Sequence, residues 1–311
     1  MILSASRRTD IPAFYSEWFI NRIKEGYLCV RNPLNLHQVS KITLSTDVID
    51  CIVFWTKNPI PMIPKLDSLK NYNYYFQFTL TGYGKDIEAN LPDKKEKLIP
   101  AFIQLSEEIG SERVIWRYDP IIFNQKYTPE YHIHAFSEIA SRLKGYTEKS
   151  VISFVDVYKK NQKNLESLNS WDLDENGLID FCRKLYDIAK ANDMVIATCA
   201  EKIDLSAVGI EHNACIDSSV IEKITGGTVK VKKDSAQREE CKCVASIETG
   251  TYNTCLNGCK YCYANYSEKT LQKNVKKYDP NSPILCDSIK PDDKITEKPM
   301  KSVIDYHIKL G

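Results

Sequence analysis

Six short apolar runs, each followed by a helical pattern, constrain the fold of this chain more than any other feature. The runs are rich in β-branched and aromatic residues, which is typical of buried strands. Buried strands that alternate with helices predict a mostly parallel sheet with right-handed crossovers. We therefore expect an α/β fold with strands at residues 1–6, 51–55, 74–80, 114–118, 151–157 and 194–199.

The segments between these runs carry the apolar spacing of amphipathic helices. Thr128 and Pro129 suit a helix start, because Thr is a favoured N-cap and Pro is favoured at the first helical position. Right-handed crossovers would curl six such units into an open sheet or a partial (β/α)6 TIM-like barrel, and the latter is the architecture we predict. The helices are expected at roughly 14–24, 94–109, 129–143 and 175–191.

The strand–helix alternation stops near residue 216. Two adjacent glycines (Gly226 and Gly227), a basic stretch and closely spaced cysteines follow it. We therefore predict a partial barrel over residues 1–215 and a cysteine-rich cap over residues 216–311, with its last part wrapped over the surface.

Composition narrows the functional classes. Apolar residues make up 43% of the chain and charged residues 27%, which suits a packed globular core. The net charge of +1 does not favour a nucleic-acid coat, although a local patch leaves nucleic acid open as a partner. No apolar stretch approaches the roughly 18 residues that span a bilayer, and the N-terminus lacks a signal-peptide pattern. We expect a cytoplasmic protein without a membrane partner.

Eleven cysteines are unevenly distributed along the chain. In a reducing cytosol such cysteines are free thiols, catalytic groups or metal ligands more often than disulfides. Seven of them fall between residues 199 and 262, and this clustering is the feature that needs a chemical explanation.

The segment TCLNGCKYCYAN brings three cysteines, Cys255, Cys259 and Cys262, within eight residues. Thiolates select iron–sulfur clusters, zinc or copper(I). Three local ligands would leave one iron of a [4Fe–4S] cluster open to a cofactor. The alternative is a structural zinc site completed by a distant Cys or His.

A second set of four cysteines could hold an auxiliary iron–sulfur cluster or a zinc ion. The alternative is that some of them are ordinary buried thiols, since free Cys is among the most buried residue types. This set comprises Cys199, Cys215, Cys241 and Cys243.

Polar residues follow most of the predicted strands, and in parallel α/β folds the functional face lies at these carboxyl ends. Arg7 and Arg8 could bind a carboxylate or phosphate, or form a surface basic pair ahead of a helix start. Arg117 and Asp119 could orient a ligand or form a structural ion pair. The catalytic candidates are Arg7, Arg8, Asp10, Lys57, Arg117 and Asp119.

Other strand-end residues are candidates for cofactor binding. Lys57 and Asn58 either contact a ligand or make the turn before Pro59, and Glu201 is a candidate partner for a ribose or an amino group. The cofactor-binding candidates are Thr56, Asn58, Asp156, Tyr158, Glu201 and Tyr261.

Four segments resemble the domain-of-unknown-function 1848 family of bacterial proteins, and the likeness spans nearly the whole chain. They read SASRRTDIPAFYSEWF, VFWTKNP, WRYDP and QREECKCVASIETGTYNTCLNGCKYCYAN. That family is noted for a C-terminal cysteine cluster similar to the N-terminal one of radical S-adenosylmethionine (SAM) enzymes. The resemblance therefore implies a class of chemistry and leaves the substrate unknown.

In radical SAM enzymes the CxxxCxxC motif followed by an aromatic residue holds a [4Fe–4S] cluster, and SAM binds its open iron. Reduction then releases a 5′-deoxyadenosyl radical. The resemblance implies this cluster on Cys255, Cys259 and Cys262, SAM as cofactor, and an electron donor of the flavodoxin or ferredoxin type.

The order of elements differs from that of radical SAM cores, in which the cluster loop follows the first strand of a partial (β/α)6 barrel. Here the motif follows the last predicted strand, so either the barrel is permuted or a C-terminal arm folds back over its mouth. Two other hypotheses stay open: an iron–sulfur binding or electron-transfer protein without SAM chemistry, and a zinc-stabilised α/β protein associated with nucleic acid.

Overall fold

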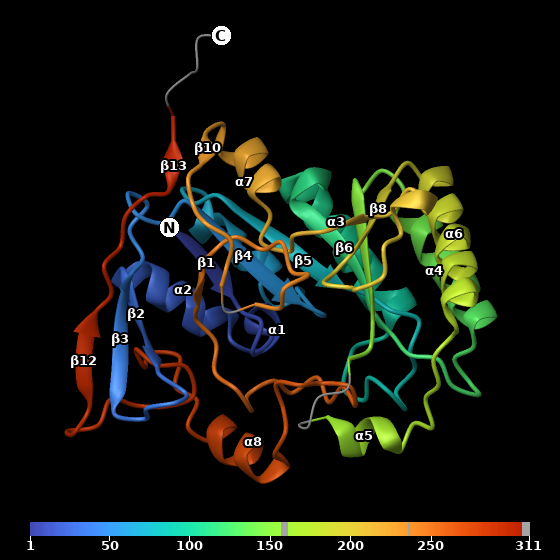
Figure 1. Cartoon of the computed structure of the whole chain (residues 1–311). Helices are drawn as coiled ribbons and strands as arrows, with labels where there is room; N and C mark the ends of the chain where they lie inside the picture. Colours follow the sequence, from blue (N-terminus) through green and yellow to red (C-terminus); the bar gives the residue numbers. More distant parts are fainter. Residues whose placement is uncertain (157–160, 236, 307–311) are drawn as a thin grey trace.

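The computed structural model describes residues 1–156, 161–235 and 237–306, and a parallel sheet forms its centre (Figure 1). All six predicted strands are present, and two short edge strands extend the sheet. The strand order is β11-β1-β4-β5-β6-β7-β8-β9, and every neighbouring pair is parallel. The strands are β1 (Ile2–Ala5), β4 (Cys51–Thr56), β5 (Tyr74–Thr79), β6 (Val114–Ile121), β7 (Lys149–Phe154), β8 (Val195–Thr198), β9 (Glu211–His212) and β11 (Ile247–Glu248).

The α/β class and the parallel sheet are thus confirmed. Within the described residues the edge strands β9 and β11 do not pair with each other, so the sheet is open and no closed barrel forms. The edge strand β11 comes from the predicted cap, because Leu3 of β1 pairs with Ile247.

The four predicted helices are also present. The side-chain oxygen of Thr128 accepts a hydrogen bond from the Tyr131 amide (3.2 Å), so it caps α4 as expected. A single π-helical turn, η2 (Lys94–Leu98), precedes α3. The helices are α2 (Ser16–Glu25), α3 (Ile99–Ile109), α4 (Pro129–Leu143) and α6 (Glu175–Ala191).

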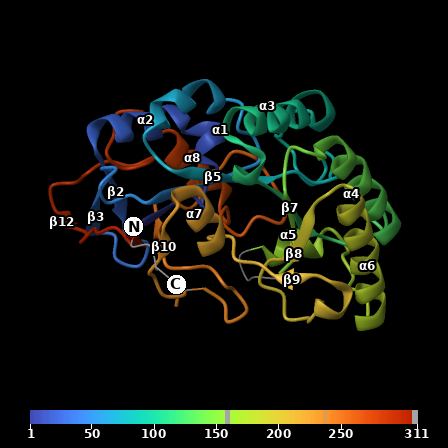
Figure 2. The same ribbon diagram turned by 90° about the horizontal axis from the view of Figure 1, so that it is seen from above.

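The long strands bury side chains on both faces of the sheet. In β4, Ile52 and Phe54 belong to the main core, whereas Cys51 and Val53 belong to a second core on the opposite face. Helices α2, α3, α4 and α6 form an arc along the main-core face (Figure 2). The second face is covered by the C-terminal part of the chain, where α7 (Ser218–Thr225) contributes the buried Ile221.

Several elements carry no clear sequence pattern. A three-stranded sheet joins β2 (Tyr27–Arg31), β3 (Gln38–Thr43) and β12 (Lys294–Glu297), and all four residues of β12 are exposed. Its pairing with β3 links segments about 250 residues apart. The remaining elements are α1 (Ile11–Phe14), α5 (Gln162–Glu166), α8 (Glu268–Val275), β10 (Thr228–Val229), β13 (Ile304–Asp305), η1 (Ile63–Leu69), η3 (Ser111–Arg113) and η4 (Ser206–Val208).

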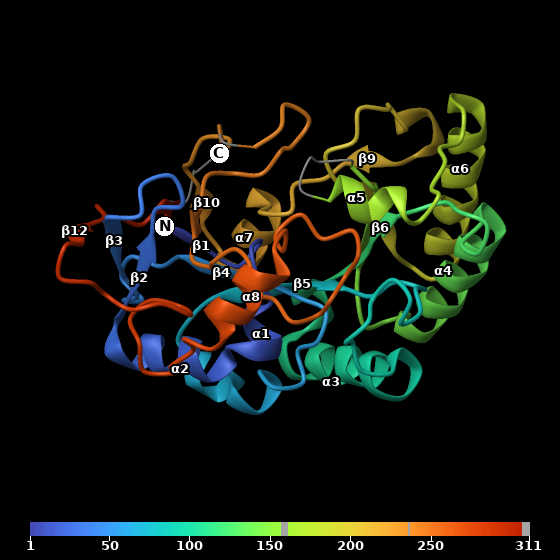
Figure 3. The same ribbon diagram turned by 90° about the horizontal axis from the view of Figure 1, so that it is seen from below.

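The chain between β11 and α8 runs across the carboxyl-end side of the sheet, which faces the reader in Figure 3. The Tyr15 hydroxyl at the end of α1 donates to the carbonyl of Thr254 (2.5 Å), and Lys260 N donates to the carbonyl of Ile87 (3.0 Å). Residues 253–264, which contain the CxxxCxxC motif, are thereby attached to the carboxyl ends of the first strands. No helix in the described part of the chain has the length and apolarity needed to cross a membrane.

Candidate functional site

A cavity of about 480 Å³ lies at the carboxyl ends of the parallel strands. The alternation along each strand explains which side chains face it. Trp55, Arg117 and Ser153 each lie two residues beyond a side chain of the second core (Val53, Ile115 and Val151), so they continue the same face. The carboxyl ends of β1, β4, β6, β7 and β8 therefore converge on one chamber.

All seven cysteines predicted as metal ligands line this cavity. We call Cys255, Cys259 and Cys262 the loop triplet, and Cys199, Cys215, Cys241 and Cys243 the four-cysteine set.

The loop triplet is shaped by a tight turn at Gly258. This glycine has a φ of +67°, and an added Cβ would lie 2.9 Å from the side-chain nitrogen of Asn90. Asn90 itself donates to the carbonyl of Leu256 (2.8 Å), and its amide donates to the carbonyl of Asn257 (3.1 Å). The turn thus fits closely against the segment after β5, and its positive φ favours glycine.

Burial disfavours the charged form of the triplet thiols. It raises the pKa of Cys259 to about 12, and it raises the pKa of Cys255 and Cys262 as well. A thiolate at these positions therefore needs a nearby cation, which a bound metal would supply.

The spacing of the triplet sulfurs bears on the kind of metal. One tetrahedral zinc ion with Zn–S bonds of about 2.3 Å requires sulfurs roughly 3.8 Å apart. Within the described residues the three triplet sulfurs do not all lie within 4.8 Å of one another. Ligands of a cluster sit on different irons and stand farther apart, so the spacing suits a cluster better than one ion.

Glu88, which the sequence did not indicate as a site residue, anchors the triplet loop through Tyr261. Its side chain is 1% exposed and accepts hydrogen bonds from the ammonium groups of Lys57 (2.8 Å) and Lys94 and from the hydroxyl of Tyr261. Although burial opposes ionisation, the two lysines lower the pKa of Glu88 to about 2. In the sequence, Glu88 is one glutamate in the loop after β5, and no pattern there indicates which residues it contacts.

Asp10 acts as a junction between three segments. Its carboxylate accepts from the hydroxyl of Thr56 (2.7 Å), the amide of Lys57 (2.8 Å), the amide of Ala13 (3.1 Å) and the side chain of Asn257 (2.9 Å). These donors lie in β4, in the turn after it, in α1 and in the triplet loop. Asp10 and Thr56 both line the cavity, and these hydrogen bonds hold the surrounding segments together; the catalytic and cofactor-binding roles of the two residues stay predictions.

The two N-terminal arginines differ in their partners. Arg7 pairs with Glu248 (3.7 Å) and Asp234 (3.5 Å), which hold its guanidinium in place. Arg8 lies over the ring of Tyr252 (4.9 Å) and donates weakly to the carbonyl of Gly250 (3.4 Å). Among the described residues no carboxylate pairs with Arg8, so this cavity-lining cation is available to an anionic group.

Arg117 and Asp119 form a buried ion pair on β6, and Ser153 donates to Asp119. The paired guanidinium lowers the pKa of Asp119 even though burial raises it. Arg117 also stacks over the Trp55 ring (5.3 Å), and both residues line the cavity. Among the catalytic candidates, Arg7, Arg8, Asp10, Lys57, Arg117 and Asp119 all face one chamber.

The cofactor candidates are divided. Tyr261 and Asp156 line the cavity, and Asp156 pairs with Arg238. Asn58 lies outside the lining and accepts from the amide of Ile60 (3.3 Å) within a turn, which is the structural role considered for it. Glu201 also lies outside, where it accepts from the amide of Phe154 (2.8 Å), and burial raises its pKa to about 7. Tyr158 falls outside the described residues.

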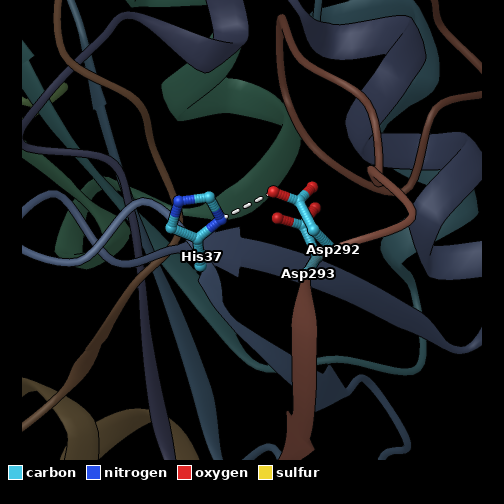
Figure 4. A group of neighbouring side chains, drawn as sticks. All are labelled: His37, Asp292 and Asp293. Carbon is cyan, nitrogen blue, oxygen red and sulfur yellow. Dashed lines mark ion pairs between the residues drawn. The ribbon is translucent and has the colours of Figure 1, made fainter.

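Among the described residues, one group away from the cavity has the spacing of ligands to a single ion. His37, Asp292 and Asp293 bring their ligand atoms within 4.8 Å of one another, and His37 pairs with Asp292 at 3.0 Å (Figure 4). Both oxygens of Asp293 are engaged by Arg31 (2.5 and 2.8 Å), and His37 and Asp292 are exposed. This arrangement is explained by surface ion pairs.

Comparison with known proteins identifies the family. A family model described as Domain of unknown function (DUF1848) matches residues 2–264, which include the cavity-lining residues of both cysteine groups. No curated protein and no solved structure matches the chain. The chain therefore belongs to the DUF1848 family.

Proposed function

We propose that this protein is a radical-SAM-like enzyme that holds a [4Fe–4S] cluster on the loop triplet. The observation that carries the proposal is that Cys255, Cys259 and Cys262 face a chamber of about 480 Å³ that charged side chains from several strand ends also line. That volume lies within the range of pockets that enclose small molecules and cofactors. In this proposal the open parallel sheet is the partial (β/α)6 barrel, and the triplet loop closes over its mouth.

The residues at the triplet fit a cluster. The three sulfurs are too far apart to bind one ion, and a metal cation would offset the raised pKa values of the thiols. Gly258 and Asn257 fix the conformation of the loop. These features suit the binding of a cluster. With three protein ligands, one iron is left for a small chelating molecule. All eleven cysteines are free thiols, which suits a reducing cytoplasm.

The cavity also offers unsatisfied groups to a ligand. Within the described chain, Trp55 Nε1 and Thr9 Oγ1 are buried and have no hydrogen-bond partner. Both residues line the cavity, as does Arg8 with its uncompensated charge. A ligand with a carboxylate and several hydrogen-bonding groups, such as SAM, matches this set.

SAM bound to such a cluster supplies a 5′-deoxyadenosyl radical after reductive cleavage of its sulfonium. The chain's own residues would bind and orient the reactants. Arg8 offers its guanidinium to a carboxylate, Tyr261 keeps the triplet loop against Glu88, and the Arg117–Asp119 pair offers charged groups to a substrate in the same cavity. The substrate is unknown, and a cytosolic flavodoxin- or ferredoxin-type protein would deliver the electron.

The test is anaerobic reconstitution with iron and sulfide, followed by reduction with dithionite in the presence of SAM. We expect a brown protein that forms 5′-deoxyadenosine, and we expect Cys255→Ala to form none above background. Cys29→Ser, which changes a buried thiol that does not line the cavity, is the matched control and should retain the activity.

Two results would count against the proposal. A protein that binds stoichiometric zinc and no iron would support the zinc-stabilised alternative. A cluster-containing protein that yields no 5′-deoxyadenosine, even with candidate substrates, would support an electron-transfer or binding protein.

A further inference from the structure

The four-cysteine set is assembled from three separate parts of the chain on the wall of the same cavity. Cys199 directly follows β8, Cys215 lies in the loop before α7, and Cys241 and Cys243 lie in the segment before β11. Tertiary folding therefore brings together residues as far apart in sequence as 199 and 243.

Two sulfur atoms of this set lie side by side, and backbone amides contact the other two. Cys199 and Cys215 have their Sγ atoms 3.2 Å apart. The amide of Ile216 donates to the sulfur of Cys243 (3.3 Å), and the amide of Cys243 donates to the sulfur of Cys241 (3.5 Å). Backbone amides directed at sulfur are the interactions that stabilise metal-bound thiolates.

A buried cation accompanies the set. Nη1 of Arg117 donates to the sulfur of Cys215 at 2.8 Å, and the side chain of Asn213 approaches the same sulfur at 3.6 Å. The loop that carries Cys215 is fixed to the sheet, because the Cys215 carbonyl accepts hydrogen bonds from the Tyr75 hydroxyl (2.7 Å) and the Gln77 side-chain amide (2.8 Å). Four thiolates and a metal centre carry net negative charge, and the guanidinium would offset part of it.

We infer that Cys199, Cys215, Cys241 and Cys243 hold a second iron–sulfur cluster, ligated by four protein thiolates. A simple pair of buried thiols would not explain four sulfurs with amide and guanidinium donors on one cavity wall. In the described residues no three of these sulfurs lie within 4.8 Å of one another, although those of Cys199 and Cys215 are 3.2 Å apart, so the four do not surround a single tetrahedral ion.

The second cluster would differ in role from the first. With four protein ligands it has no iron left for SAM or substrate, so it serves electron transfer or holds the cavity wall together. The inference does not rest on SAM chemistry at the loop triplet, because it uses a different set of residues.

The experiment measures iron, sulfide and zinc in anaerobically reconstituted full-length protein. One variant replaces the triplet (Cys255→Ala/Cys259→Ala/Cys262→Ala), and a second replaces half of the other set (Cys241→Ser/Cys243→Ser). Cys29→Ser is the control for changing a buried thiol outside the cavity. Wild type and the control should hold about eight irons per chain, and each multiple variant about four.

The triplet variant is decisive because it leaves the four-cysteine set intact, whatever the stability of the other variant. Retention of about half the iron and of the visible absorption in this variant supports the second cluster. Complete loss of iron, or its replacement by one zinc per chain, overturns it. If instead the triplet holds no cluster, Cys241→Ser/Cys243→Ser loses all its iron, so failure of the proposed function is distinguishable.

Discussion

The two cysteine groups face one cavity but are built in different ways. The sulfurs of the loop triplet come from eight consecutive residues turned by Gly258, whereas those of the four-cysteine set come from three segments. The triplet loop is anchored by the hydrogen bond from the Tyr261 hydroxyl to Glu88, and the four-cysteine set by the hydrogen bond from Arg117 to the Cys215 sulfur. A local loop with three ligands leaves room for chemistry, while four ligands from distant segments tie the structure together.

The difference also teaches where each site is vulnerable. The triplet depends on a loop and on a buried charge network behind it, so single substitutions outside the cysteines should affect it selectively. The four-cysteine set depends on the packing of the second face of the sheet, on which Cys215, Cys241 and Cys243 are part of the core.

The largest selective effect is expected for Glu88→Gln. The change leaves the buried ammonium groups of Lys57 and Lys94 without their carboxylate, which should lower the free energy of unfolding by about 3–5 kcal/mol. It also weakens the support of Tyr261, so iron at the loop triplet should fall while iron at the four-cysteine set stays. Denaturant unfolding and iron analysis measure the two effects.

Glu138→Gln is the matched control, because Glu138 pairs with Lys95 on the surface. It should cost less than about 1 kcal/mol and leave both sites filled. Equal loss of iron from both sites in Glu88→Gln would contradict this account, because it would mean that both sites depend on the interactions of Glu88.

A pH effect belonging to neither site is expected from His132. This imidazole is buried between Tyr118 (2.9 Å) and the carbonyl of Ile122 (3.0 Å), and burial lowers its pKa to about 4. Its contribution to stability is therefore complete above about pH 6.5 and is lost as the pH falls toward 4. The shift corresponds to about 3 kcal/mol.

Unfolding free energies of wild type and His132→Gln between pH 4.5 and 7 test this. Glu201, with a pKa raised to about 7, titrates in the same window with the opposite sign, so the difference between the two proteins isolates His132. That difference should shrink toward acid pH and should be the same in the triplet variant. A difference that is independent of pH would show that the imidazole does not control this window.

The smallest effect is expected for Gly258→Ala, compared with Gly26→Ala. Both glycines have positive φ, +67° and +77°, so each substitution should cost about 1 kcal/mol. Only at position 258 does the new Cβ meet a neighbour, because nothing lies within 4 Å at position 26. Gly258→Ala should therefore reduce cluster occupancy at the triplet, while Gly26→Ala should not. Equal occupancy in both variants would show that the turn tolerates a side chain.

Much of the fold was predictable because its strands and helices carry strong local patterns. Helix α6 begins and ends where the apolar spacing predicted, and the capping role of Thr128 follows from its residue type and from Pro129 beside it. The exposed strand β12 was missed because pairing with β3 defines it, and its own side chains show no periodicity.

The candidate site was likewise predictable only where residue type or spacing carries a local signal. The spacing of Cys255, Cys259 and Cys262 made them candidate ligands, and the strand ends correctly indicated Arg117 and Lys57 as cavity residues. Glu88 and Asn257 were missed because their roles come from tertiary contacts with Tyr261 and Asp10. The catalytic role of Asp10 stays a prediction, whereas its four hydrogen bonds, which join three segments of the site, come from tertiary contacts that the sequence does not indicate.

The most direct measurement is electron paramagnetic resonance of the dithionite-reduced protein with and without SAM. The account predicts two cluster signals, of which only the one that disappears in Cys255→Ala changes when SAM is added. If no signal responds to SAM, or if the responding signal persists in Cys255→Ala, the loop triplet is not an open site for this cofactor and the central claim is wrong.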